Sequence, residues 1–330
     1  MKDLPRYNLL GSSPQFQQTH AHIQKIASVD ATVLIAGETG TGKEMAARAI
    51  HYLGSRSDHP FIPVNCGALA ETLIESELFG HERGAFTDAK AASPGLVSEA
   101  NGGTLFLDEI DALSPKAQAA MLRFLQDRTY RRVGSGLTRQ ADVRIIVASN
   151  ANLEQMVEER RFRRDLLYRL NVLTLRMPAL REREGDAVEL ARIFLARFSR
   201  QYRLESKTFH PDSLGFIERH AWPGNIRELE NAVHRGFLMC EGSEVLLEGA
   251  RGDAASVKPA QELEVNFKAA KARAIAEFER RFISDLLGRT DGNISRAARL
   301  ADQDRSAFGK LARKHGLGQS SAAQSMEAGE

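Results

Sequence analysis

Short runs of apolar and β-branched residues alternate with longer amphipathic segments over the first 180 residues of the chain. The runs that predict strands are 32–36, 61–65, 104–108, 143–148 and 172–175. The segments that predict helices between them include 43–53, 71–79 and 115–127. Strands that are apolar along their whole length and alternate with helices are typical of a parallel sheet covered on both faces. We therefore expect an α/β domain over residues 1–180.

The pattern changes after residue 180. Residues 181–248 have no strand pattern and predict a small all-helical domain. Residues 249–263 include the Gly-, Ala- and Pro-rich stretch GARGDAASVKPAQ and predict a linker. Helical periodicity returns over 264–318, and the polar tail 319–330 predicts disorder.

Composition narrows the class of protein. The chain has 330 residues, of which 42% are hydrophobic and 27% charged, with a formal net charge of +2, and these are values of an ordinary globular protein. Its two cysteines, Cys66 and Cys240, cannot build a disulfide scaffold, so we expect a reduced, cytoplasmic compartment. No apolar run approaches the roughly 18 residues of a membrane span.

A glycine-rich segment follows the first predicted strand and opens a predicted helix. It consists of Gly37, Glu38, Thr39, Gly40, Thr41, Gly42, Lys43 and Glu44. In this context glycines allow backbone N–H groups to surround a phosphate at a helix N-terminus, and the lysine adds a charge for the β- and γ-phosphates. The alternative, a glycine-rich turn without function, does not explain the strand, spacing, lysine and helix together. We predict an ATP site here.

Two carboxylates end the predicted strand 104–108. Because strands of a parallel sheet end at one edge, Asp108 and Glu109 are expected beside the phosphate loop. Asp108 suits the shell of a Mg²⁺ ion bound with the nucleotide, and Glu109 suits the polarisation of an attacking water. An acidic pair at a strand end is a weak signal alone, and the glycine-rich segment upstream makes it a strong one.

Five motifs together resemble a known family, the AAA+ activators of sigma-54 RNA polymerase, also called bacterial enhancer-binding proteins. They are GETGTGKE at 37–44, ELFGHERGAFTDA at 77–89, GGTLFLDEI at 102–110, FRRDLLYRLN at 162–171 and WPGNIREL at 222–229. The resemblance covers roughly residues 8–245 and the C-terminal helices. It implies a P-loop AAA+ α/β sheet with helices on both faces, an all-helical lid and a C-terminal helix-turn-helix domain. Glu44 after the lysine is usual in that family.

The resemblance also implies roles for single residues. Asn65 resembles the switch residue that pairs with Glu109, and Ser149 and Asn150 occupy the sensor I position. The residues that match the family's arginine fingers and its sensor II are Arg163, Arg169 and Arg227. Without the resemblance, the arginines of 160–164 would be read as a solvated charged face or a loose phosphate-binding patch. Trp222 is expected in the core.

The segment 80–94 interrupts a predicted helix pair with glycines and small residues around Phe86, which we expect to be exposed. The family reads GAFTGA here and uses the loop to grip sigma-54. The corresponding residues of this chain are Gly84, Ala85, Phe86, Thr87, Asp88 and Ala89. Asp88 replaces the second glycine, which removes conformational freedom and adds a negative charge. In the alternative structure Phe86 folds back onto the domain.

The segment 292–317 reads as a helix-turn-helix with Asp304 as N-cap of the second helix. Ile294, Ala297, Ala298 and Leu300 form the expected apolar face of the first helix, and Ala307, Phe308, Leu311 and Ala312 that of the second. The residues left for DNA are Arg305, Ser306, Gly309, Lys310 and Arg313. Seven Lys and Arg against four Asp between 285 and 318 favour phosphate contact. The alternative is a helical hairpin for dimerisation, a role we also expect for helix 264–287.

Together these features predict a transcription activator that binds an upstream DNA site, assembles a homo-oligomeric ring, hexameric by resemblance, and drives sigma-54 holoenzyme into the open complex with ATP and Mg²⁺. The short start is similar to the family's receiver-less phage-shock and type III secretion activators, so control is expected from a negative-regulator protein or from expression level. Two alternatives stay open. One is a DNA-binding AAA+ regulator of another polymerase, suggested by GAFTDA, and the other is a general AAA+ remodeller.

Overall fold

The computed structural model describes residues 9–70, 72–86, 89–250 and, nearer the C-terminus, 279, 282–284, 286–288, 290, 293–301 and 303–315. The chain forms two compact units that divide after residue 253. The predicted linker 249–263 from residue 251 onward, most of the expected helix 264–287 and the predicted tail 319–330 lie outside the described residues.

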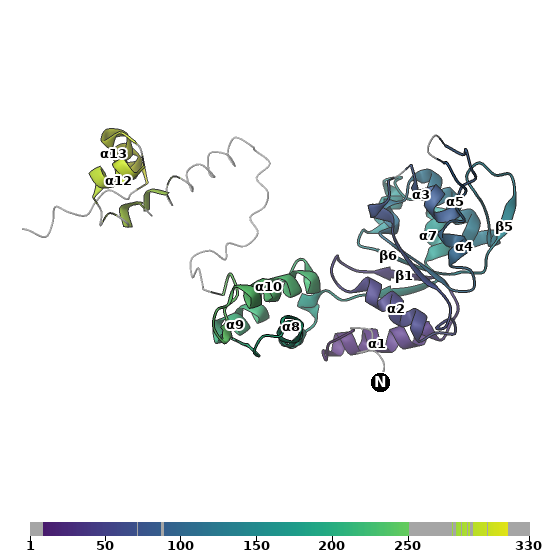
Figure 1. Cartoon of the computed structure of the whole chain (residues 1–330), viewed down its shortest axis with the longest axis horizontal. Coiled ribbons are helices and arrows are strands. Elements are labelled where there is room, and N and C mark those ends of the chain that lie inside the picture. The colour runs from purple at the N-terminus through teal and green to yellow at the C-terminus, as the bar shows by residue number, and fades with distance from the viewer. Residues whose placement is uncertain are drawn as a thin grey trace, which may run out of the picture. The chain divides into compact units, whose positions relative to one another are not determined.

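The centre of the first unit is a five-stranded parallel sheet of order β2-β3-β6-β1-β7 (Figure 1). Its strands are β1 (Val33–Ala36), β2 (Phe61–Asn65), β3 (Thr104–Asp108), β6 (Arg144–Ser149) and β7 (Leu173–Arg176). All five predicted strands are therefore confirmed, with ends that move by at most one residue. The register places Asn65 beside Asp108 and Ala36 beside Ser149, so that polar residues gather at the carboxyl edge of the sheet.

Helices cover both faces of this sheet (Figure 1). One face carries α1 (Pro14–Ala27) and α2 (Lys43–Tyr52), and the other carries α3 (Ile74–Phe79), α4 (Leu96–Glu99), α5 (Pro115–Asp127), α6 (Leu153–Glu158) and α7 (Arg164–Leu170). Successive strand residues supply the two cores in alternation. Leu105 and Leu107 pack on the α5 side and Phe106 on the α1 side, which explains why β3 is apolar throughout.

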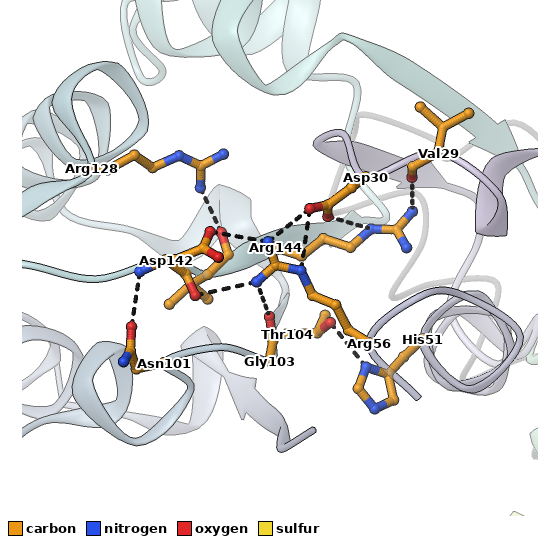
Figure 2. Close-up of polar contacts among 11 residues, drawn as sticks. Val29, Asp30, His51, Arg56, Asn101, Gly103, Thr104, Arg128, Asp142 and Arg144 are labelled. Atoms are coloured by element: carbon orange, nitrogen blue, oxygen red, sulfur yellow. Dashed lines mark hydrogen bonds and ion pairs between the residues drawn. The ribbon is translucent and has the colours of Figure 1, made fainter. Parts of the chain in front are cut away.

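Polar side chains join the starts of β1, β3 and β6 at the opposite edge of the sheet (Figure 2). Arg56 forms ion pairs with Asp30 and Asp142, at 2.7 and 3.0 Å, and donates to the Gly103 carbonyl. Arg144 is buried and donates to the backbone carbonyls of residues 26 and 29. These contacts join the segments at which β1, β3 and β6 begin.

The lid follows β7 and the 3₁₀ turn η4 (Leu180–Glu182). It consists of α8 (Asp186–Tyr202), α9 (Pro211–Arg219) and α10 (Asn225–Met239). Trp222 is buried in its core, as expected, and the indole N–H donates to the Ile217 carbonyl at 2.9 Å. The prediction that the lid is all-helical is wrong in one detail. β8 (Thr208–Phe209) and β9 (Glu244–Val245) form a parallel pair, and strands of two residues are too short to leave a periodic pattern.

The remaining elements of the first unit are short. They are the hairpin β4 (Thr129–Arg131) and β5 (Thr138–Gln140), with the 3₁₀ turns η2 (Cys66–Ala68) and η3 (Ile110–Ala112). No helix among the described residues is both long and apolar enough to pass through a bilayer.

In the second unit α12 (Ile294–Leu300) and α13 (Arg305–Lys314) pack together, as the helix-turn-helix pattern predicts. Asp304 caps α13 by accepting from the backbone N–H of Ser306 at 2.7 Å. Two expected core positions are wrong, because Leu300 and Ala307 are exposed. Ala297, Ala298 and Phe308 already fill the small interface between the two helices.

Candidate nucleotide site and surrounding surfaces

The glycine-rich segment connects β1 to α2 at the carboxyl edge of the sheet. The Lys43 side chain is buried at the start of α2, and its Nζ donates to the carbonyls of Gly37 and Glu38 at 2.8 and 3.1 Å. Burial lowers the pKa of Lys43, and the carboxylates of Asp108, Asp111 and Glu109 oppose that shift. The ammonium group of Lys43 therefore lies within the curve of the loop, and its binding of phosphates remains a prediction.

Asp108 and Glu109 lie opposite this lysine. Burial raises the pKa of the half-buried Asp108, while the neighbouring Lys43 charge acts in the other direction. Glu109 adopts a left-handed backbone with φ 54°, and its N–H donates to Asp108 Oδ1 at 3.0 Å. A non-glycine residue in this conformation is uncommon and turns the chain sharply. The chain therefore turns between β3 and η3, and the Glu109 carboxylate lies beside Gly67.

Asn65 approaches the same acids from β2. A Cβ atom added to Gly67 would lie 2.1 Å from Glu109 Oε2 and 3.3 Å from Asn65 Oδ1, so both side chains converge on this glycine. Asn65 Oδ1 accepts a hydrogen bond from the Ala68 N–H at 3.0 Å. Within the described residues, no hydrogen bond joins Asn65 to Glu109. The pairing of the two as a switch remains a prediction.

The end of β6 contacts the phosphate loop directly. Asn150 Nδ2 donates to Thr39 Oγ1 at 3.0 Å. The hydroxyl of Ser149 donates to Asp111 Oδ1 at 2.6 Å, and the Ser149 carbonyl accepts from the Gly37 N–H. Both predicted sensor I residues thus border the site. Sequence reasoning missed Asp111, although the run Asp-Glu-Ile-Asp places a third acid one turn after Asp108.

The lid closes one side of the site. Arg227 lies beside Gly40, because a Cβ added to that glycine would be 3.2 Å from Arg227 Cβ. Its positive charge also acts on the titration of Lys43 and Asp108. A cavity of about 550 Å³ borders Thr39 and Arg227 and continues along α10. The predicted sensor II residue is therefore next to the phosphate loop.

The two predicted arginine fingers lie elsewhere. Arg163 and Arg169 are exposed on and just before α7, and α7 packs on the sheet face opposite α2. The guanidinium of Arg163 pairs with Asp165, and its backbone N–H donates to Gln118 Oε1. Neither arginine contacts the phosphate loop of its own chain.

A junction between loop and lid is the feature that sequence reasoning missed most completely. Arg181 pairs with Glu38, and Asn225 donates to Glu38 Oε2 at 3.1 Å and to the Thr39 carbonyl at 3.0 Å. The pKa of Glu38 falls to about 2, chiefly because of the hydrogen bonds from Arg181 and then from Asn225. Sequence separations of 143 and 187 residues leave no local signal for these contacts.

The predicted partner loop has a fixed base. The backbone of His81 forms isolated β-bridges with Ser93 and with Val133, and the Glu82 carboxylate forms an ion pair with Arg132 at 3.2 Å. The expectation that Phe86 is exposed is wrong, because its side chain is half-buried and its ring lies 4.9 Å from that of His81. Ala85 and Ala89 are half-buried and buried, Gly84 is exposed, and Thr87 and Asp88 lie outside the described residues.

The predicted DNA-contacting residues share one helix, α13. Arg305, Ser306, Lys310 and Arg313 are exposed, as the helical spacing predicts. Gly309 is half-buried rather than exposed, because it faces α12, where a Cβ would be 4.0 Å from Ile294. That is an ordinary contact distance, so packing against α12 does not require glycine at this position.

Comparison with known proteins agrees with this geometry. Residues 9–176 match the family described as the sigma-54 interaction domain, and residues 181–263 match an AAA+ ATPase lid domain. The chain is 44% identical over 294 residues to the transcriptional regulatory protein ZraR of Salmonella typhimurium, covering 89% of this chain and 66% of ZraR. It is 42% identical over 317 residues to the regulatory protein AtoC of Escherichia coli K12, covering 94% and 68%.

A solved structure is similar over almost the whole chain. It is NtrX from Brucella abortus in complex with ATP, with 32% identity and a TM-score of 0.69, and the likeness covers 93% of this chain and 69% of NtrX. A second structure of NtrX, in complex with ADP, has a TM-score of 0.71. The chain spans about two thirds of the length of ZraR, AtoC and NtrX.

Proposed function

Because the chain belongs to the family of sigma-54-dependent AAA+ transcription activators, we propose that it hydrolyses ATP to convert sigma-54 polymerase from the closed to the open promoter complex. The observation that carries this proposal is the convergence of Lys43, Asp108 and Asn150 at one edge of the sheet. NtrX, a relative of the same fold, is known in complex with ATP and with ADP.

In the proposed reaction Lys43 binds the β- and γ-phosphates, and the backbone N–H groups of the loop surround them. Mg²⁺ in such sites is usually held by one or two carboxylates together with the substrate phosphates, and Asp108 would be the carboxylate that holds it here. The ion would neutralise charge that develops on the phosphates. Glu109 orients and polarises the attacking water. Asn150 and Arg227 approach the phosphates from β6 and from the lid.

The proposed catalytic site is completed by a second copy of the chain. Arg163 and Arg169 project from a face that their own phosphate loop does not share. A suitably placed arginine accelerates phosphoryl transfer by about 10³–10⁵ because it stabilises the charge on the γ-oxygens. If both arginines act on a neighbour's nucleotide, hydrolysis requires a closed ring, for which the family resemblance suggests a hexamer.

Two surfaces connect this cycle to transcription. Residues 80–94 would contact sigma-54, and their base is attached to the nucleotide domain through backbone hydrogen bonds with Val133. The exposed cations of α13 would bind the phosphates of an upstream DNA site, because phosphate contacts supply most of the affinity of such modules.

Transcription with purified components tests the proposal. Promoters are first found by genome-wide mapping of the sites that the protein occupies, and open complexes are then measured with sigma-54 holoenzyme, ATP and the full chain. We expect open complexes with the natural protein and none with Glu109→Gln. ATP hydrolysis without open complexes at these promoters would contradict the proposal.

One alternative rests on a specific observation. Asp88 places a carboxylate where the family's motif has a glycine, so the loop could have lost its grip on sigma-54. The protein would then be a DNA-binding AAA+ regulator of the housekeeping polymerase. Repeating the transcription assay with that polymerase distinguishes the two functions.

A further inference from the structure

The lid reaches the phosphate loop through one buried asparagine. Asn225 is fully buried, has a left-handed backbone with φ 54°, and stands at the N-terminus of α10. Asparagine tolerates this conformation better than most residues. The left-handed backbone is nevertheless less favourable than a right-handed one, and the hydrogen bonds of the Asn225 side chain must offset this cost.

The contacts of Asn225 join three segments that are distant in the sequence. Its Oδ1 accepts from the Leu180 N–H at 2.8 Å, while its Nδ2 donates to Glu38 Oε2 and to the Thr39 carbonyl. The amide thus uses its acceptor on the lid side and its donors on the loop side. A side chain with a different donor pattern cannot replace it without losing one of these partners.

Two further contacts surround the asparagine. The Arg181 guanidinium makes a two-point ion pair with Glu38, one bond of which measures 2.8 Å. The Ile226 N–H donates to the Gly40 carbonyl at 3.0 Å. Gly40 has φ 79°, and a Cβ there would lie 2.3 Å from the Gly224 carbonyl oxygen, so only glycine allows the lid to approach this closely.

We propose that Asn225 of the lid and Arg181 of η4 are positioning residues that brace the phosphate loop, partly through Glu38 of the loop itself, so that the loop holds its nucleotide-binding shape and releases nucleotide slowly. The proposal rests on the proposed ATPase function. None of the three is a catalytic residue, because each acts through the shape of the loop: Asn225 contacts the Thr39 carbonyl and the Glu38 carboxylate, and Arg181 contacts the Glu38 carboxylate. Loss of the brace leaves the phosphate-binding groups in place but lets the loop relax, which raises the dissociation rate of ADP.

The polarity of the contacts supplies a specific test. Asn225→Asp puts a carboxylate against the Glu38 carboxylate and removes the donors that face the loop. Adding Glu38→Gln returns an amide donor between the two side chains, with the direction of the hydrogen bond reversed. If position 225 needed only a side chain of a certain size, adding Glu38→Gln to Asn225→Asp would not restore nucleotide binding.

A matched control exists within the lid. Arg197 and Glu230 form an exposed ion pair whose side chains are 47% and 39% accessible, against 45% and 43% for Arg181 and Glu38. The Arg197–Glu230 pair does not include a residue of the phosphate loop. Glu230→Gln therefore removes an equivalent charge and pair without disturbing the brace.

The experiment measures equilibrium binding and dissociation of a fluorescent ADP analogue with the full chain. Asn225→Asp is expected to weaken binding about tenfold or more, the scale of one lost hydrogen bond to a charged group, through faster dissociation. Adding Glu38→Gln should restore part of that loss, and adding Glu230→Gln should restore none. The melting temperature without nucleotide monitors folding.

The outcomes separate the brace from the function. If the natural chain bound no ADP analogue, the proposed ATPase function would fail. If it bound normally but the Glu38→Gln addition gave no recovery over Asn225→Asp alone, the brace would be excluded while the ATPase function stood. Arg181→Ala provides a second route, because it should speed dissociation while Glu230→Gln does not.

Discussion

The guanidinium of Arg163 is bound by both carboxylate oxygens of Asp165, at 3.0 and 2.8 Å. The hydrogen bonds that Arg163 donates to Asp165 raise the pKa of Arg163 and lower the pKa of Asp165, so both groups stay charged at neutral pH. The pair lies on the surface at the start of α7. Among the described residues this guanidinium contacts Asp165 and not the phosphate loop of its own chain, and its action on a neighbour's nucleotide remains a proposal.

Removing the arginines should stop hydrolysis without preventing nucleotide binding. We expect Arg163→Ala and Arg169→Ala each to lower the ATPase rate by about 10³ or more, because charge on the γ-oxygens loses its stabilisation. Steady-state ATPase assays measure this rate, and ADP-analogue binding should remain unchanged.

Mixing two inactive proteins tests whether the arginines act between subunits. Arg163→Ala has an intact Glu109, and Glu109→Gln has an intact Arg163, so mixed rings contain some complete interfaces. Activity should reappear on mixing. A mixture as inactive as its components would place both residues in one subunit's site, and full activity of the isolated monomer would have the same meaning.

The buried ion pair of Arg183 and Asp186 predicts a large effect on stability. Both side chains are 0% exposed. The Asp186 carboxylate also accepts hydrogen bonds from the backbone N–H groups of Ser12 and Ser13 and from the Ser13 hydroxyl. Asp186→Ala leaves a buried guanidinium without its partner, and we expect the free energy of unfolding to fall by about 3–5 kcal/mol. Urea denaturation measures it, with the exposed Glu184→Ala as the neutral control.

The same pair has a defined pH dependence. Burial works to raise the pKa of Asp186, but hydrogen bonds from Arg183 and Ser13 outweigh it, and the pKa lies below its ordinary value. A lowered folded-state pKa stabilises the protein above the unfolded pKa, and this contribution is lost as the pH falls toward the folded value. The stability gap between the natural chain and Asp186→Ala should therefore stay constant from pH 7 to 5 and narrow below about pH 4.

The two cysteines should differ in reactivity. Burial, followed by the charges of Asp108, Asp111 and Glu109, raises the pKa of Cys66 to about 12, so its thiolate is absent at pH 8. Cys240 is only half-buried. Iodoacetamide at pH 8 should modify Cys240 alone in the native chain and both cysteines in denaturant, as counted by mass spectrometry. Equal labelling of both in native protein would contradict the packing around η2.

Phe86 should separate hydrolysis from activation. We expect Phe86→Ala to keep its ATPase rate and to lose activation, since an aromatic anchor at an interface contributes about 2 kcal/mol, or roughly thirtyfold in affinity. The ring packs beside His81, so it must leave that contact to reach a partner. Equal loss of ATPase and activation would make Phe86 a structural residue.

Much of the fold could be predicted from the sequence, because apolar runs and caps are local signals. Helix α5 begins and ends where the pattern predicts, since Ser114 caps it and Pro115 occupies its first turn. The paired strands β8 and β9 could not be predicted, because two residues carry no period. The exposure of Leu300 depends on how little surface α12 and α13 share, which only the packed structure reveals.

The candidate site divides in the same way. Lys43, Asp108 and Asn150 follow strand ends or the glycine loop, and the rule that parallel strands end at one edge places them together. The brace of Glu38, Arg181 and Asn225 joins segments through the orientation of the lid, which no local pattern encodes. Phe86 was expected to be exposed because a glycine-rich loop suggests a free tip, whereas its neighbour His81 offers a ring to pack against.

The base of the partner loop has a mechanical consequence. The backbones of Gly80 and Glu82 form hydrogen bonds with Val133, and the backbone of His81 forms two with Ser93. The segment after α3 is therefore hydrogen-bonded to two other segments of the chain. These four hydrogen bonds restrict movement at the base of the loop. A rotation of α3 would therefore carry the backbone of residues 80–82, Ser93 and Val133 along together, because these hydrogen bonds hold them as one body.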